Sequence, residues 1–298
     1  MGRDSPDRRD GWTARRRSAE IASVDASPSP DERTAVSDDA LSALRDAIAA
    51  ETRFGGAPLE LHDVLDSTAT RITRLADEGA PHGTLVLARR QKKGRGRRGN
   101  SWASPKGGLW FSLLLRHQES FEDAPTSLLA GYAVSQAVDE VARVATTLKW
   151  PNDILLNGKK IGGVIAESGR DAAGPRLLLG IGVNVNLGIR DFPFMLRASV
   201  TSLQLETGRE HDPGDLLVAI LSWLDGHLLA REEGKGPYLI GQISDRMPLV
   251  GKEIRATEGR ATVRGQVIGL TRSGALMVQT KEGRRSLHAG EVEEVRPS

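Results

Sequence analysis

The sequence contains no cysteine among its 298 residues. This absence excludes disulfides, thiolate nucleophiles and cysteine-ligated zinc sites, and it favours a cytoplasmic protein. Its six histidines are scattered, and no two have the i,i+3 or i,i+4 spacing that places two imidazoles on one helical face. We therefore predict no metal site built by the protein itself.

Long apolar runs and targeting signals are also missing. No hydrophobic stretch approaches the ~18 residues that a membrane helix needs. The arginines at 15–17 are not followed by the apolar segment of a secretory or twin-arginine signal. We therefore expect a soluble protein that is not exported. Since the chain has 41 basic and 39 acidic side chains, its net charge does not indicate a nucleic-acid-binding protein.

The chain is long enough for two domains. Residues 1–40 mix Arg, Asp, Ser and Pro with few large apolar residues, which predicts a disordered tail. Residues 41–246 contain long periodic segments and are expected to form the larger domain. From 247 to 298, short alternating segments separated by glycine turns predict a small all-β barrel.

Apolar periodicity and turn residues predict the elements of the larger domain. Asn157-Gly158 indicates a hairpin, and the 124–145 helix is expected to have a cap at Asp123 and Pro125 at its first position. The predicted elements are a helix from Asp39, a strand at 59–65, a helix capped by Ser67 or Thr68 and ending at Gly79, strands at 83–91 and 107–116, a helix at 124–145, a strand-turn-strand unit at 146–168, a strand at 176–186 and a helix at 212–234.

The segment "QKKGRGRRGNSW" joins two of these strands. Seven of the ten residues from Arg89 to Arg98 are basic and none is acidic, so an anion must offset their repulsion. Its glycines let backbone N–H groups approach phosphate or carboxylate closely. The alternative is a solvated basic loop with ordinary turn glycines. The pattern is neither a Walker motif nor a dinucleotide fingerprint.

Four further features accompany this loop, each with an ordinary structural alternative. Trp102 either covers an anion or purine or serves as a core aromatic. "LKWPND" holds Lys149 and Asp153 around a Trp-Pro turn, and "GKKIGG" sets Lys160 beside two glycines that leave room for a ligand. Asn184 ends the strand "GIGVN" and is either a ligand-binding or a structural amide.

In this order and spacing, the stretches from about residue 59 to 298 resemble the biotin protein ligases. The resemblance rests on "DSTAT", "GRGRRG", "GGLWFSLLLR", "LKWPND", "GKKIGG" and "GIGVNVN". It implies an α+β fold: a mixed, largely antiparallel sheet flanked by helices, as in class II aminoacyl-tRNA synthetases, with an SH3-like β-barrel at the C-terminus. In such ligases the glycine-arginine loop closes over biotin and the reactive biotinyl-adenylate.

The resemblance also implies roles for particular residues. Lys160, Arg97 and Asp153 would be catalytic. Biotin would contact Ser67, Thr68, Gln91, Arg95, Gly96, Arg97 and Lys160. ATP and the adenylate would contact Trp102, Lys149, Asn152 and Asn184, with Asp153 nearby.

The implied reaction has two steps and uses ATP, Mg²⁺ and biotin. The biotin carboxylate attacks the α-phosphate of ATP, and a lysine of a biotin carboxyl carrier protein, part of a biotin-dependent carboxylase, then takes the biotinyl group. Cationic side chains let the two anions meet. No nucleophile of the enzyme is required, which agrees with the missing cysteine.

Two positions depart from the family pattern. Ala69 stands where an asparagine is usual, and Asn100 follows Gly99 where an arginine is common. The rival interpretations are a lipoyl-type ligase of the same superfamily and a basic nucleic-acid-binding protein. The segment before residue 59 shows only one convincing helix, which is too little for a DNA-binding winged helix. We therefore expect a monofunctional ligase without sequence-specific DNA binding. A homodimer is a further possibility.

Overall fold

The computed structural model describes residues 38–116, 124–258, 261–288 and 291–294. The tail predicted for 1–40 therefore lies almost entirely outside the described residues, as does the predicted cap Asp123. Within the described ranges, no helix is both long and apolar enough to cross a bilayer.

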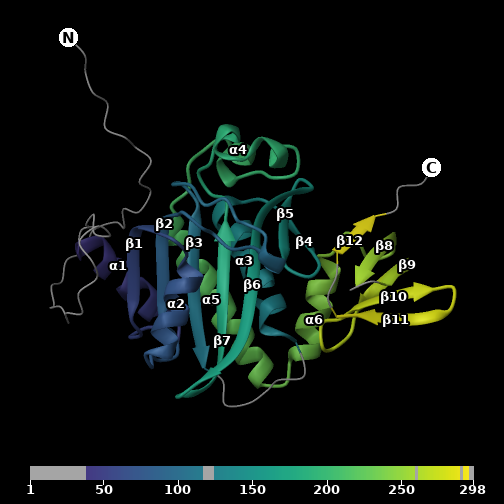
Figure 1. Cartoon of the computed structure of the whole chain (residues 1–298), viewed down its shortest axis with the longest axis horizontal. Coiled ribbons are helices and arrows are strands. Elements are labelled where there is room, and N and C mark those ends of the chain that lie inside the picture. Colours follow the sequence, from purple (N-terminus) through teal and green to yellow (C-terminus); the bar gives the residue numbers. More distant parts are fainter. Residues whose placement is uncertain (1–37, 117–123, 259–260, 289–290, 295–298) are drawn as a thin grey trace, which may run out of the picture.

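A seven-stranded sheet forms the centre of the larger domain (Figure 1). Only β1 and β2 pair in parallel, and every other neighbouring pair is antiparallel. The mixed, largely antiparallel sheet predicted by resemblance is confirmed. In spatial order its strands are β1 (Leu59–Leu65), β2 (Leu85–Gln91), β3 (Leu109–Arg116), β7 (Gly174–Val183), β6 (Lys159–Asp171), β5 (Asp153–Leu156) and β4 (Thr146–Lys149).

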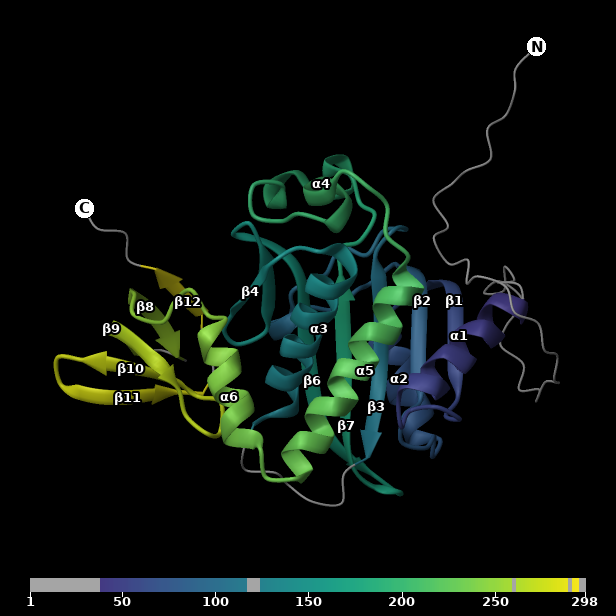
Figure 2. The same cartoon turned by 180° about the vertical axis from the view of Figure 1, so that it is seen from behind.

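Helices cover the two faces of the sheet unequally. Seen from behind, α3 (Thr126–Ala142) and α5 (Pro213–Glu232) cross one face together (Figure 2). They bury the main core against β3, β7 and β6, and α1 (Asp38–Glu51) packs beside α5. The other face carries α2 (Thr68–Asp77), which buries a smaller cluster around Ile72 and Leu114. This helix covers only part of that face, which leaves room for a pocket.

The smaller module is an antiparallel five-stranded sheet that follows α6 (Gly236–Asp245). Its edge strands are β11 and β12, and it lies beside the β4 end of the molecule (Figure 1). The small β module predicted after residue 246 is thus present. Its strands are β8 (Glu253–Glu258), β9 (Ala261–Leu270), β10 (Leu276–Thr280), β11 (Gly283–Leu287) and β12 (Glu291–Glu294).

Several sequence predictions need correction in detail. The 146–168 unit contains three strands rather than two, because the Trp-Pro turn separates β4 from β5 before the predicted hairpin at Asn157-Gly158 leads into β6. Pro125 occupies the N-cap of α3 and not its first position. Ser67 is the N-cap of α2, but its side chain makes no capping bond. Helix α6 and the short α4 (Leu203–Thr207) were not predicted.

Candidate active site

The pocket lies on the α2 face of the sheet, where small side chains hollow the surface. Because alternate residues of a strand share a face, Gly180 and Gly182 of β7 both point toward the pocket. Their partners complete two rows across β3, β7 and β6: Ser112–Gly180–Ile165 and Trp110–Gly182–Gly163. The resulting cavity has a volume of about 880 Å³, which is ample for a small-molecule ligand.

A chain of hydrogen bonds closes the α2 end of the pocket. The Gln91 side-chain oxygen accepts from the backbone N–H of Thr68 at 2.8 Å and from its hydroxyl at 3.1 Å. The Gln91 amide nitrogen donates to Ser104, and Ser112 donates to the Thr68 hydroxyl. Four segments of the chain are thereby fixed to one another.

Ser67 lies beside this network but does not join it. Its side chain is buried, with 3% exposed, and its hydroxyl has no hydrogen-bond partner. An unpaired buried hydroxyl costs about 1–3 kcal/mol relative to one with a partner. Since Ser67 lines the pocket, the partner that it lacks can come from a ligand.

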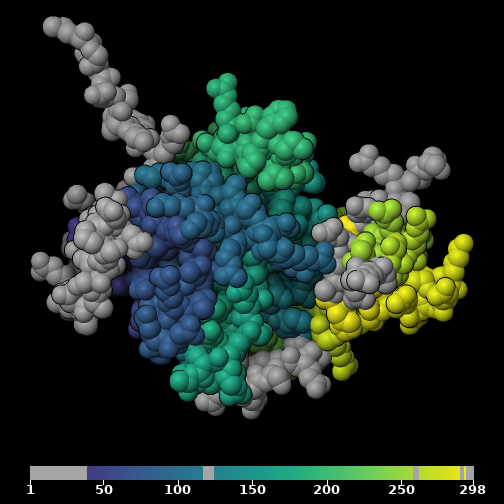
Figure 3. All heavy atoms as spheres, viewed as in Figure 1, coloured from purple at the N-terminus to yellow at the C-terminus, as the bar shows by residue number. Residues whose placement is uncertain are grey.

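The glycine-arginine loop folds over the pocket as a compact turn. The Gly96 N–H donates to the Asn100 carbonyl at 2.6 Å, and the Trp102 N–H donates to the Gly94 carbonyl at 2.8 Å. A Cβ at Gly94 would collide with the Trp102 carbonyl, so this position requires glycine. Figure 3 shows this face, with blue residues across its middle and the green segment that contains α4 above them.

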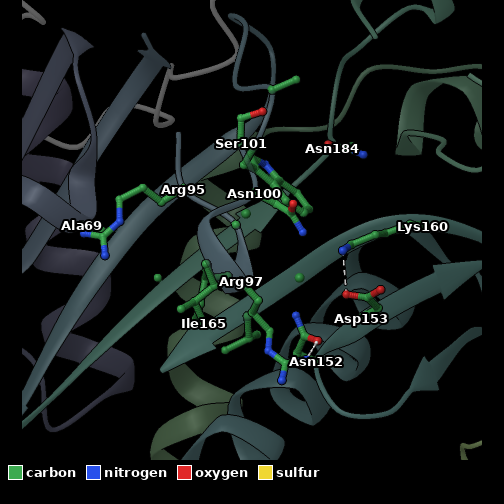
Figure 4. A pocket seen from close by; sticks show the side chains of 18 of the residues that line it. Ala69, Arg95, Arg97, Asn100, Ser101, Asn152, Asp153, Lys160, Ile165 and Asn184 are labelled. Carbon is green, nitrogen blue, oxygen red and sulfur yellow. Dashed lines mark hydrogen bonds and ion pairs between the residues drawn. The ribbon is translucent and has the colours of Figure 1, made fainter. Parts of the chain in front are cut away.

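Three cations of the predicted site enter the pocket from different directions (Figure 4), and each already contacts the protein. Lys160 forms an ion pair with Asp153 at 2.6 Å. The Arg97 guanidinium donates to the Asn152 side-chain oxygen at 2.9 Å, and Arg95 donates to Glu167 at 2.6 Å. Within the basic run from Arg89 to Arg98, carboxylates offset part of the mutual repulsion, because Arg95 pairs with Glu167 and Lys93 pairs with Asp66 at 2.9 Å.

Trp102 lies flat against the glycine row of the floor. A Cβ at Gly182 would be 2.9 Å from its indole nitrogen, and one at Gly163 would be 3.4 Å from its ring. The Lys160 ammonium lies 4.9 Å from the ring centroid, a cation–π distance. The room that the sequence predicted beside the glycines is therefore filled by this indole, whose nitrogen is buried without a hydrogen-bond partner.

The Trp-Pro turn and the end of β7 supply the other end of the pocket. The pocket is lined there by Lys149, the last residue of β4, by Asn152 of the turn, and by Asp153, the first residue of β5. Asn184 follows the last residue of β7, as predicted, and donates from its side chain to the Thr201 carbonyl at 2.8 Å. This amide is thus structural and also lines the pocket.

Every site residue predicted from the sequence lies on this one pocket, together with both departures, Ala69 and Asn100. Sequence reasoning missed the segment at 192–200, of which Phe192, Leu196, Ser199 and Val200 line the pocket, and it missed Val292 of β12. The missed segment includes the apolar residues Phe194 and Met195 of "DFPFML", and 78% and 86% of their surfaces remain exposed.

The missed segment is anchored just beyond the pocket. Lys160 and Val200 form a parallel bridge, with the Lys160 N–H donating to the Ser199 carbonyl at 2.8 Å. Further on, the Thr201 hydroxyl donates to Glu206 at 2.6 Å, and this hydrogen bond is the main reason that the pKa of Glu206 is lowered. The 192–200 segment is thus fixed at its C-terminal end and has an apolar, exposed middle.

The pocket carries no metal-binding cluster of its own. Across the described ranges, no group of three or more His, Asp or Glu side chains could hold an ion. The two pocket carboxylates, Asp153 and Glu167, are each engaged by a cation. These residues therefore do not fit a resident divalent-metal site.

The arrangement of the pocket indicates the kind of ligand that it can bind. A pocket with a polar end, a cationic middle and an aromatic floor suits an anionic small molecule. Consistent with this class, residues 61–186 match the model of the biotin/lipoate A/B protein ligase family, and residues 249–293 match the C-terminal domain of biotin protein ligases.

Proteins with similar sequences identify the family more closely. The bifunctional ligase/repressor BirA of Bacillus subtilis is 36% identical over 82% of this chain and 78% of its own length. The biotin–[acetyl-CoA-carboxylase] ligase of Paracoccus denitrificans is 34% identical over 76% of this chain and 96% of its own. The chain belongs to the biotin protein ligase family.

A solved structure supports the same assignment. The biotin protein ligase of Aquifex aeolicus, solved in complex with biotin and ATP, superposes with a TM-score of 0.71 at 33% identity. The match covers 80% of this chain and 99% of that one, so it includes both the central sheet and the small β module. The expected fold class is confirmed.

Proposed function

We propose that this protein is an ATP-dependent biotin protein ligase that forms biotinyl-5′-AMP and transfers biotin to a lysine of a carrier protein. The observation that carries the proposal is the convergence of Arg95, Arg97 and Lys160 on one pocket whose buried end holds the unpartnered hydroxyl of Ser67. Family membership and the ligands of the Aquifex aeolicus structure support the choice of biotin and ATP.

Biotin is assigned to the α2 end of the pocket. Its ureido group needs hydrogen-bond donors and acceptors in an otherwise apolar site, which Ser67, Thr68 and Gln91 offer there. Its carboxylate would then lie toward Lys160 and Arg97. Arg95 and Gly96 would close over it from the glycine-arginine loop. The nucleotide is assigned to the other end, against Trp102, Lys149, Asn152 and Asn184.

The first step joins two anions. A biotin carboxylate oxygen attacks the α-phosphorus of ATP, the bond to the bridging oxygen breaks, and pyrophosphate leaves. Lys160 and Arg97 would neutralise the carboxylate and the α-phosphate during this approach, exchanging their contacts with Asp153 and Asn152 for contacts with the reactants. Fixed cations in a pocket closed to water are a large source of such catalysis.

The second step attaches biotin to the carrier. A lysine amine attacks the acyl carbon of the mixed anhydride, the bond to the phosphate oxygen breaks, and AMP leaves. The amine must lose a proton, and Asp153 is the carboxylate of the pocket placed beside Lys160 to receive or relay it. Positioning of the two reactants supplies the rest of the acceleration.

The identity of the carrier, the metal ion, the cellular location and the oligomeric state are also proposals. The carrier would be the biotin carboxyl carrier protein of a carboxylase, as the name of the Paracoccus denitrificans relative suggests. Mg²⁺ would arrive as MgATP. The cysteine-free composition supports a cytoplasmic location. We propose a monofunctional ligase, although the Bacillus subtilis relative is named as a repressor as well. A homodimer stays a prediction.

The direct test is incubation of the protein with biotin, MgATP and a biotin carrier domain, followed by mass spectrometry of the carrier. We expect one lysine to gain the biotinyl mass, with release of pyrophosphate that depends on biotin. Lipoate in place of biotin should give no comparable modification. Modification by lipoate alone, or binding of nucleic acid with a steep salt dependence and no modification, would support one of the rival functions.

Replacing Ser67 with alanine should weaken biotin binding roughly tenfold, because a neutral hydrogen bond contributes about 1–1.5 kcal/mol. The melting temperature of the free protein should stay the same or rise, since alanine removes a buried hydroxyl that has no hydrogen-bond partner. Calorimetric titration with biotin measures the first effect. Ser199→Ala is the matched control, because Ser199 lines the pocket near Val200 and already donates to the Leu196 carbonyl. Unchanged biotin affinity in Ser67→Ala would contradict the assigned biotin end.

A further inference from the structure

The small β module reaches the pocket directly with Val292 and also contacts Trp150, the aromatic residue of the Trp-Pro turn, which lines the pocket. Trp150 is buried, and its indole nitrogen donates to the Gly274 carbonyl at 3.0 Å. Gly274 belongs to the turn at 271–275, which joins β9 to β10. The two residues are 124 positions apart in sequence, so this bond links the two parts of the fold directly.

The 271–275 turn fits closely against the start of α3. Gly274 has φ of +75°, and a Cβ there would be 2.5 Å from the Leu128 side chain and 3.0 Å from Pro125. The Ala124 N–H also donates to the Arg272 carbonyl at 2.9 Å. Only glycine satisfies both the backbone conformation and the available space. The turn is therefore held in one position relative to the larger domain.

A second attachment holds β4, the strand that enters the Trp-Pro turn. The Leu148 N–H donates to the Arg246 carbonyl at 2.9 Å, directly before the small module begins. The Arg246 side chain is itself fixed by Asp139 at 2.6 Å and Ser135 at 2.8 Å. This edge of the sheet is thus supported by the chain that leads into the module.

The Trp-Pro turn consequently lies between two supports. On the sheet side, the Val164 N–H donates to the Asn152 carbonyl at 3.0 Å. On the other side, the turn is held by the hydrogen bond from Trp150 to Gly274 of the small module. This short segment carries three residues whose side chains line the pocket: Lys149, Asn152 and Asp153.

We propose that the 271–275 turn of the small β module positions the Lys149–Asp153 segment through the hydrogen bond from Trp150 to Gly274. Trp150 and Gly274 are then positioning residues for the nucleotide end of the pocket. The link between the two turns stands on the contacts alone, whereas its effect on ATP rests on the proposed function.

Trp150→Phe tests the link, because phenylalanine keeps the aromatic ring and removes the indole N–H. In the full chain, we expect amide hydrogen exchange to accelerate in peptides covering 149–164, including the amides of Asn152 and Val164. The KM for ATP in biotin-dependent pyrophosphate release should rise roughly tenfold. The dissociation constant for biotin should change less than about twofold. Gly274→Ala, which displaces the 271–275 turn, should increase both the exchange at 149–164 and the KM for ATP further.

Trp223→Phe is the matched control, since it removes an indole hydrogen bond to Glu140 at a place where neither residue lines the pocket. It should leave exchange at 149–164 and the KM for ATP unchanged. Wild-type exchange in Trp150→Phe would overturn the link between the two turns. A lowered melting temperature with an unchanged KM for ATP in an active enzyme would overturn the positioning role at the nucleotide end. If the wild type releases no pyrophosphate, the proposed function fails, while the exchange measurement still decides whether the turns are coupled.

Discussion

Replacing Lys160 with alanine should lower biotin-dependent pyrophosphate release about 10²–10³-fold at saturating biotin and ATP, the usual effect of removing one fixed donor from a developing charge. Lys160 is the residue at which several features of the pocket meet. It pairs with Asp153, lies over Trp102, and is held by its own N–H on the Ser199 carbonyl. Without its ammonium group, the carboxylate and the α-phosphate would repel each other with less compensation.

Lys159→Ala gives the matched control for this experiment. Lys159 precedes Lys160 on β6, carries the same charge, and is exposed outside the pocket lining. It should retain the wild-type rate, which separates the loss of a pocket cation from the loss of overall charge. Both variants should keep the wild-type melting temperature within a few degrees. Pyrophosphate release at the wild-type rate in Lys160→Ala would contradict the role of Lys160.

Replacing Arg97 with alanine should release the adenylate before transfer. Arg97 reaches from the glycine-arginine loop to Asn152 on the far side of the pocket, so it ties the loop to the nucleotide end. Its removal frees that contact and withdraws one cation from the adenylate phosphate. We expect free biotinyl-adenylate in solution, per pyrophosphate formed, to increase at least about tenfold without carrier. Chromatography of the quenched reaction measures the ratio.

Lys92→Ala removes one positive charge from the same loop and serves as the comparison. Lys92 is exposed and lies outside the pocket lining, and its structural contact is a backbone bond to the Leu65 carbonyl. Its adenylate should stay bound as in the wild type. Equal release from both variants would mean that loop charge in general, rather than the contact between Arg97 and Asn152, retains the adenylate.

The main elements and most of the site could be predicted from the sequence because local chemistry decides them. Asn157 and Gly158 both adopt positive φ, as their hairpin signal requires. Asn184 ends its strand where the apolar run ends. The basic loop, the Trp-Pro turn and the Lys160 strand carry their own motifs. The family resemblance then grouped these segments, and the structure places them on one pocket.

What the sequence could not give depends on contacts between distant segments. Alternation predicts that Gly180 and Gly182 share a face, but not that Trp102 from another segment fills the space above Gly182. The end of β4 was missed because Lys149 and Asp153 pair across the Trp-Pro turn, so two short strands were taken as one. The 192–200 segment carries no periodic pattern, and only its packing beside Lys160 brings it to the pocket.

The contacts that Lys160 and Arg97 make within the protein also bear on how the pocket would distinguish biotin from its neutral derivatives. A carboxylate can take over the interactions that Lys160 and Arg97 give up with Asp153 and Asn152. An ester, alcohol or amide of biotin offers no charge in exchange, so the contacts with Asp153 and Asn152 would persist and such a derivative should bind more weakly. Selectivity for the free acid would then come from competition inside the protein as well as from fit to the ligand.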